Sequence, residues 1–143
     1  MQQTEDQILA GYVDKMGPEL GALFHAIDAE LSWLHWRWKQ YRILFGEKPS
    51  RIDLLNQSAP FFFRVIHDVL FEDTLLGIAR LVGPARSAGN PNLTILRFSA
   101  AIAAVQIRGE VDELIEKAKA SAAFAIDWRN HHIAHRNLDL AQA

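Results

Sequence analysis

The fold class follows from residues 18–46, whose sequence is PELGALFHAIDAELSWLHWRWKQYRILFG. Apolar residues recur there in alternating steps of four and three, at Leu20, Phe24, Ile27, Leu31, Leu34, Trp38, Tyr41 and Phe45. Only a helix places such positions on one stripe. Pro18 suits the first turn of that helix, and Gly46 suits its end. The stretch therefore predicts one long amphipathic helix.

Helical patterns also flank this stretch. Residues 4–15 predict a short helix before it, weakened by glycine. After it, residues 50–82 predict a second long helix, with apolar residues every seven positions at Leu55, Phe62, Val69 and Leu76. Pro60 lacks a backbone N–H and clashes with the preceding turn, so this helix should kink or divide near residue 59.

The remaining chain predicts a loop and two further helices. Residues 83–92 are rich in glycine, proline and asparagine and predict a loop. Residues 94–106 predict a modest helix that Gly109 ends, and a last helix should start near Glu110. Because no useful period-two alternation or hairpin dipeptide occurs, we expect no strands.

These elements predict an all-α fold: an antiparallel bundle of four principal helices plus a short N-terminal helix. The 143 residues suit a single domain over 1–143. Half of the residues are hydrophobic, 22% are charged and the net charge is -2, which excludes a disordered chain and a general nucleic-acid coat. Any contact with phosphate therefore requires a local cationic site.

The lack of cysteine and the lack of a signal peptide or membrane span limit the possible chemistry and the expected location of the protein. The chain has no cysteine, which excludes disulfides, thiolate zinc sites and cysteine nucleophiles. The first residues lack the basic start and apolar run of a signal peptide, and no stretch approaches the ~20 apolar residues of a membrane span. We expect a cytoplasmic protein without a membrane partner.

Residues 128–137 form the candidate site, with three of the six histidines and two arginines. The inward stripe of the last helix, Val111, Ile115, Ala118, Ala122 and Ala125, continues onto Arg129, His132 and Arg136. Because a charge at a core position is costly, this change indicates the mouth of a cavity or an interface. The alternative is a helix end that leaves the bundle, with cations favoured by the helix dipole.

A second line of residues shows the same change. It runs through Ile52, Ala59, Ile66, Asp73 and Arg80. Asp73 is a natural partner for the Arg129 region, where it would orient a histidine or fix an arginine. An internal Asp73–Arg80 ion pair without function is the alternative.

Aromatic and basic residues mix on an outer face of the first long helix, at Trp33, His35, Trp36, Arg37 and Lys39. Such a face can stack bases, but large aromatics outside a core stripe more often lie in a subunit contact. The isolated His25 and His67 indicate no site.

The segment Arg129-Asn130-His131-His132-Ile133-Ala134-His135 resembles the motif of the HEPN superfamily of helical nucleases, an arginine, a polar residue, four to six positions and a histidine. Together with residues 24–45 and 73–81, it resembles the AbiU-type branch, named for abortive phage infection. The resemblance covers most of the chain. It implies a HEPN-like bundle, a homodimer whose two motifs face one cleft, and metal-independent cleavage of RNA.

The same resemblance assigns roles to the motif residues. Arg129 would orient and neutralise the scissile phosphate, and His135 would assist proton transfer as the ribose 2′-hydroxyl attacks. Asn130 occupies the polar position. On a straight helix His135 points about 120° away from Arg129, while His132 and Arg136 stay near its face. Either the helix loosens and ends near residue 133, or His132 shares the role, or the partner subunit supplies the missing direction.

A metal site is a weaker interpretation of the same histidines. His131 and His135 are four apart and could chelate an ion, but no acidic third ligand lies nearby in the sequence. We therefore expect no metal and no cofactor.

The sequence supports three functional hypotheses. The first is a metal-independent endoribonuclease acting in phage defence or as the toxin of a toxin–antitoxin pair, with RNA as substrate and an antitoxin as a further partner. The second is a catalytically silent module that binds a nucleotide, an RNA or a protein. The third is a structural dimerisation domain, which leaves the polar positions Asp73, Arg80, Arg129 and His132 without a purpose.

Overall fold

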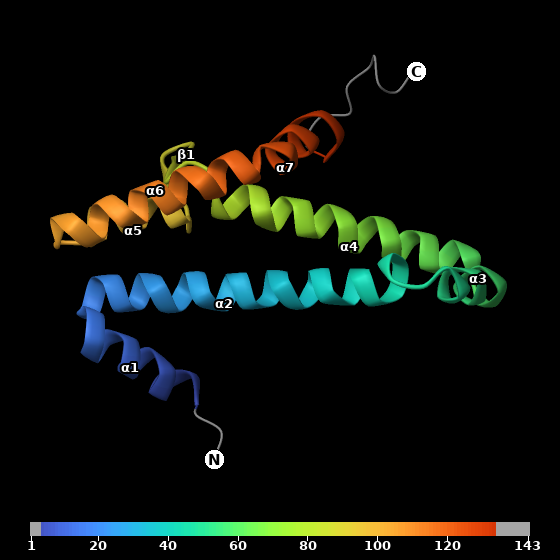
Figure 1. Cartoon of the computed structure of the whole chain (residues 1–143), viewed down its shortest axis with the longest axis horizontal. Coiled ribbons are helices and arrows are strands. Elements are labelled where there is room, and N and C mark those ends of the chain that lie inside the picture. The colour runs from blue at the N-terminus through green and yellow to red at the C-terminus, as the bar shows by residue number, and fades with distance from the viewer. Residues whose placement is uncertain (1–3, 134–143) are drawn as a thin grey trace. The chain divides into compact units, whose positions relative to one another are not determined.

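The computed structural model describes residues 4–133, which are predominantly helical (Figure 1). The α-helices are α1 (Glu5–Met16), α2 (Pro18–Tyr41), α3 (Pro49–Ser58), α4 (Pro60–Leu81), α5 (Phe98–Ala101), α6 (Val105–Ser121) and α7 (Ala123–Trp128). Two π-helical turns, η1 (Arg42–Gly46) and η3 (Arg129–Ile133), and one 3₁₀ turn, η2 (Ile95–Arg97), accompany them. The all-α prediction is confirmed. No helix in this part of the chain is long and apolar enough to cross a membrane.

The described residues divide into two compact units. Unit 1 comprises residues 4–31 and 80–123, and unit 2 comprises residues 32–79 and 124–133. The long helix α2 contributes to both units. The expectation of a single domain over residues 1–143 stays a prediction.

The start of unit 1 is fixed by local signals. The Thr4 hydroxyl accepts a hydrogen bond from the Gln7 backbone N–H at 3.3 Å, and the Gln7 side chain accepts one from the Thr4 N–H at 3.0 Å. This reciprocal capping box begins α1. Gly17 ends α1 at a φ of 82°, a conformation that glycine adopts without strain, and Pro18 begins α2 as predicted.

The predicted second helix divides where proline requires it. Helix α3 ends at Ser58, Ala59 lies outside helical geometry, and Pro60 begins α4. The predicted first helix keeps its α geometry to Tyr41 and widens into η1 before it ends at Gly46. The expected break near residue 59 is therefore confirmed.

A short hairpin corrects the expectation of no strands. Strand β1 (Arg86–Ser87) pairs antiparallel with β2 (Asn90–Pro91) inside the predicted loop. Ala88 and Gly89 connect them with φ values of 48° and 83°. Two successive residues with positive φ form the turn that suits a two-residue hairpin. The hairpin was not predicted because Ala88, and not the usual asparagine, occupies the first position with positive φ.

The segment after the hairpin also differs from the prediction. The expected helix over residues 94–106 is replaced by η2 and the short α5, and α6 begins at Val105, before Gly109. Gly109 lies inside α6, where a helical glycine costs only about 1 kcal/mol relative to alanine. A cost of this size does not by itself end a helix, and α6 continues through the glycine.

Each unit has its own buried residues. Those of unit 1 include Ile27, Leu81, Val82, Ile102, Ile115 and Ala122, and those of unit 2 include Leu34, Leu75, Ala79 and Ala125. Several residues of the predicted apolar stripes are exposed instead, including Leu31 at 53%, Phe62 at 60% and Val69 at 56%.

One buried polar residue organises the turn after α4. Thr94 is 0% exposed, and its hydroxyl lies 2.8 Å from the carbonyl oxygens of both Leu81 and Gly83. The same hydroxyl accepts from the Leu96 backbone N–H and caps η2. Thr94 thereby ties the hairpin segment of unit 1 to the end of α4.

Candidate functional site

The predicted site begins where α7 changes its geometry. Helix α7 ends at Trp128, and Arg129, Asn130, His131 and His132 all lie in the π-helical turn η3. Such turns are rare and occur frequently at functional sites. The loosening that we considered as a way to reorient the motif is thus present. His135 and Arg136 lie outside the described residues, and their placement stays a prediction.

The guanidinium of Arg129 is held by its neighbour. The Asn130 side-chain oxygen accepts hydrogen bonds from Arg129 Nε at 3.1 Å and from Nη2 at 2.8 Å. Arg129 is half-buried, and no acidic residue in the described chain forms an ion pair with it. Because the amide is neutral, it orients the guanidinium and leaves the positive charge uncompensated.

His131 is oriented by the preceding turn. Its Nδ1 lies 2.9 Å from the Asp127 carbonyl oxygen and 3.1 Å from the Asp127 carboxylate. This contact corrects our statement that no acidic residue lies nearby, because Asp127 precedes His131 by one helical turn. Within residues 4–133, no cluster of three histidine, cysteine or acidic side chains could hold a metal ion.

His132 lies on an aromatic surface. Its ring stacks on Trp128 with centroids 4.2 Å apart and planes at 23°, and Trp128 in turn meets Phe71 of α4 edge-on at 5.5 Å. The stack fixes the start of η3 against α4 within unit 2. His132 remains exposed.

Asp73 has a different partner from the one we expected. Its carboxylate forms an ion pair with Arg37 of α2, within unit 2. Arg37 is therefore half-buried against α4 and does not belong to the outer aromatic face. A support of Arg129 by Asp73 is not what the structure shows. Arg80 is exposed and belongs to unit 1, and its supporting role stays a prediction.

A polar network around His67 was missed by the sequence analysis. His67 Nε2 lies 3.0 Å from the Tyr41 hydroxyl, and His67 Nδ1 lies 2.9 Å from Asp68 Oδ1. Arg64 Nε donates to the other Asp68 oxygen at 3.1 Å. With the proton on Nδ1, the carboxylate fixes the histidine tautomer and Nε2 accepts the tyrosine proton.

The network changes the pKa of two of its members. Hydrogen bonds from His67 and then from Arg64 lower the pKa of Asp68, since they favour the ionised carboxylate. Burial, followed by the Asp68 charge, raises the pKa of Tyr41. The i, i+3, i+4 spacing of Arg64, His67 and Asp68 on α4 was the available signal. Tyr41 could not be added from sequence because it lies on another helix.

The outer aromatic face is present on α2. Trp33 is 61% exposed and Trp36 is 54% exposed, and their rings meet edge-on at 5.8 Å. A second exposed apolar stripe lies on α4 of the same unit, at Phe61, Phe62, Val65 and Val69. Apolar exposure on this scale is typical of a surface that another chain covers.

The comparison with known proteins yields one match. A HEPN family model with the description AbiU2 matches residues 17–143, which is well over half of the chain and includes the whole motif. No significant match was found among curated proteins or among solved structures.

Proposed function

Because the chain belongs to the AbiU2 family of HEPN proteins, we propose that it is a metal-independent endoribonuclease that acts in phage defence or as the toxin of a toxin–antitoxin pair. One observation carries this proposal. The motif arginine, Arg129, lies in η3, where a neutral amide orients it and no acidic residue within 4–133 forms an ion pair with it. In a chain with a net charge of -2, this is the local cationic site that a phosphodiester requires.

The proposed reaction is an internal transfer at phosphorus. The ribose 2′-oxygen attacks the adjacent phosphorus, the bond to the 5′-oxygen breaks, and a 2′,3′-cyclic phosphate remains. Arg129 binds the phosphate oxygens and stabilises the charge that grows on them in the transition state. His135 takes or returns the proton, with His132 as the alternative, which is worth about 10²–10⁴-fold in rate.

A second copy of the chain completes the proposed site. Each subunit contributes one Arg129 and one histidine, so that a base and an acid are both available for the two proton transfers. The exposed tryptophans of α2 and the apolar stripe of α4 are the surfaces that support a homodimer. Both belong to unit 2, as does Arg129.

The decisive experiment incubates the full-length protein with mixed RNA in the presence of a chelator and identifies the new ends. We expect cleavage with cyclic phosphate ends, lost in Arg129→Ala and in His135→Ala. Arg86→Ala is a matched control, because the residue is exposed and lies outside both the motif and the proposed dimer surfaces. Cleavage that stops with the chelator, or that survives both motif substitutions, contradicts the proposal.

One observation favours the silent binding module as a second candidate. Both described histidines of the motif are engaged by their own helix, His131 with Asp127 and His132 with Trp128. A module of this kind binds RNA through Arg129 and leaves it intact. In the same experiment it gives an Arg129-dependent mobility shift without new RNA ends.

A further inference from the structure

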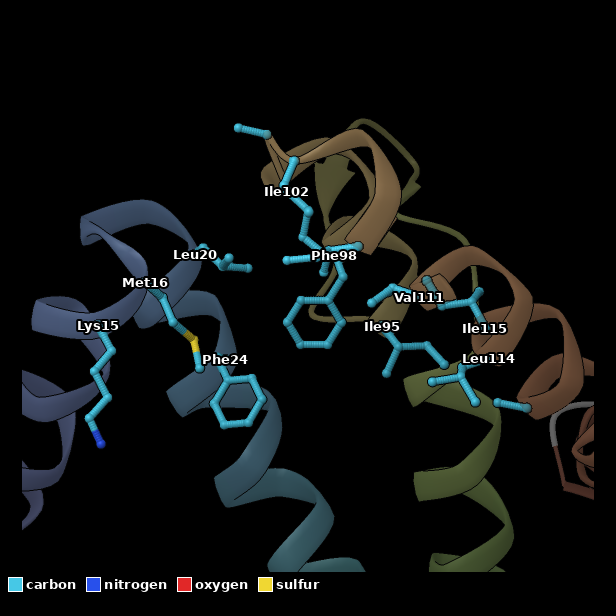
Figure 2. A pocket seen from close by; sticks show the side chains of 14 residues that line it. Lys15, Met16, Leu20, Phe24, Ile95, Phe98, Ile102, Val111, Leu114 and Ile115 are labelled. Carbon is cyan, nitrogen blue, oxygen red and sulfur yellow. The ribbon is translucent and has the colours of Figure 1, made fainter. Parts of the chain in front are cut away.

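Unit 1 contains an apolar cavity that the proposed function does not use. Its volume is about 760 Å³, and its walls come from α1, α2, η2, α5 and α6 with the residues that join α5 to α6. Figure 2 shows Met16 and Phe24 on one side, and Phe98 and Leu114 on the other. None of the predicted site residues lines it. A volume of this size lies in the range of small-molecule sites.

The lining is apolar and open to solvent. Every lining residue except Lys15 is hydrophobic, and two of them, Ile107 and Leu114, are more than half exposed. The rings of Phe24 and Phe98 lie 6.1 Å apart, so α2 and α5 meet beside the cavity, while Ile107 and Leu114 of α6 stay exposed. Uncovered apolar surface in such a concave site favours a ligand with an apolar body.

The only charged group of the lining is suited to an anion. Lys15 forms no ion pair with any described residue. Three other cations near these walls are engaged: Arg108 donates to the Ile102 carbonyl, Arg97 donates to the Asn92 carbonyl, and Lys119 pairs with Glu116. Lys15 lies at the edge of the lining, beside Met16 in Figure 2. A lysine at the rim of an apolar site can lay its stem along apolar surface while its ammonium stays in water.

We propose that this cavity binds a free, unbranched aliphatic carboxylate, with its chain between α2 and α6 and its head group at Lys15. One ammonium matches a monoanion, whereas phosphate groups are usually held by the bidentate guanidinium of arginine. The proposal is independent of the nuclease activity.

Calorimetry on the full-length protein tests the proposal, with octanoate, decanoate and dodecanoate below their micellar concentrations. We expect one site per chain and an affinity that rises about fourfold for each added methylene, because each buried methylene contributes about 0.8 kcal/mol. Dodecanol should bind about two- to fivefold more weakly than dodecanoate, the effect of one exposed ion pair. Lys15→Gln should remove that difference between acid and alcohol.

A matched pair of variants locates the site on α6. Ala118 lines the cavity, and Ala120 is exposed on the same helix outside it. Ala118→Phe should weaken dodecanoate binding at least tenfold, and Ala120→Phe should not. Leu114→Asp provides a second variant that keeps the fold, because the side chain is already exposed. It should weaken dodecanoate by charge repulsion.

Three results would overturn the proposal. The first is no binding of dodecanoate by the folded protein. The second is equal binding by Ala118→Phe and Ala120→Phe, or an affinity that does not depend on chain length. The third is a cavity closed by a second copy of the chain, which would appear as dodecanoate affinity that falls as protein concentration rises. RNA cleavage by the same preparation would be unaffected in each case.

Discussion

The substitution Asn130→Asp tests the proposed role of Arg129 with almost no change in shape. Asparagine and aspartate are isosteric, so the oxygen that accepts from Arg129 Nε and Nη2 stays in place. What changes is charge, because the new carboxylate neutralises the guanidinium that the amide leaves charged. We therefore expect weaker binding of the scissile phosphate in the ground state and in the transition state.

The magnitude follows from the distances. The Asn130 oxygen lies 2.8 Å from Arg129 Nη2, and a phosphate oxygen bound on the far side of the guanidinium adds a similar distance. At a separation of about 6 Å, the repulsion is about 0.7 kcal/mol in water and about 3 kcal/mol at an effective dielectric constant of 20. Arg129 is half-buried, so we expect about 1–2 kcal/mol, a five- to thirtyfold loss in kcat/KM.

The assay is cleavage of a dinucleotide. Because this substrate has a single phosphodiester, its binding to the wild-type protein should depend only weakly on salt. The loss in Asn130→Asp should shrink between about 0.1 M and 1 M salt, because the Debye length falls from about 10 Å to about 3 Å. Asn130→Ala removes the clamp but not the charge, so its defect should not depend on salt. Equal defects in the two variants at both salt concentrations would refute the electrostatic argument.

Three further predictions concern the framework around the sites. Thr94→Val should destabilise the protein by about 2 kcal/mol, because it removes the buried hydroxyl that bonds the Leu81 and Gly83 carbonyls. In thermal denaturation it should lower the melting temperature more than Thr94→Ser does, and the opposite order would refute the role of the hydroxyl. Gly21→Ala should cost about 1–3 kcal/mol, because a Cβ there would lie 2.7 Å from the Tyr12 backbone, whereas Gly109→Ala, with nothing within 4 Å, should stabilise by up to about 1 kcal/mol; equal melting temperatures would contradict both. The lowered pKa of Asp68 means that its contribution to stability is complete above the ordinary value of 3.8 and is lost as pH falls through the lowered pKa. Acid titrations of the wild type and Asp68→Asn should therefore converge below that range, and a constant gap down to the lowest pH would argue against the His67 and Arg64 contacts.

The sequence predicted the helices well where the cause is local. The four-three alternation over residues 18–46 and the prolines at positions 18 and 60 each act within one or two turns, and each has its expected effect. The predictions were wrong where a single residue was taken to decide the local structure. Gly109 was given too much weight against the apolar face of α6, and the hairpin at residues 86–91 uses an alanine at positive φ.

Part of the candidate site could be predicted from the sequence. The motif from Arg129 to His132 is a local pattern, and the Arg129–Asn130 and His131–Asp127 contacts lie within one turn. The π-helical turn itself was not predicted, because the spacing indicated only that the helix would loosen near residue 133, that His132 would share the role, or that the partner subunit would supply the missing direction. The edge-on contact of Trp128 with Phe71 of α4 joins residues far apart in the sequence, which the spacing does not encode.

By itself, therefore, the sequence determined which segments are helical, which faces of them are apolar and where the cationic motif lies. Only the tertiary structure decided that Asp73 pairs with Arg37, that His67 joins Tyr41 to Asp68, and that the lining of unit 1 leaves a cavity beside Lys15. The physical reason is that periodicity fixes the face of a helix on which a residue lies. It does not fix the rotation and offset of one helix against another, and these select each distant partner.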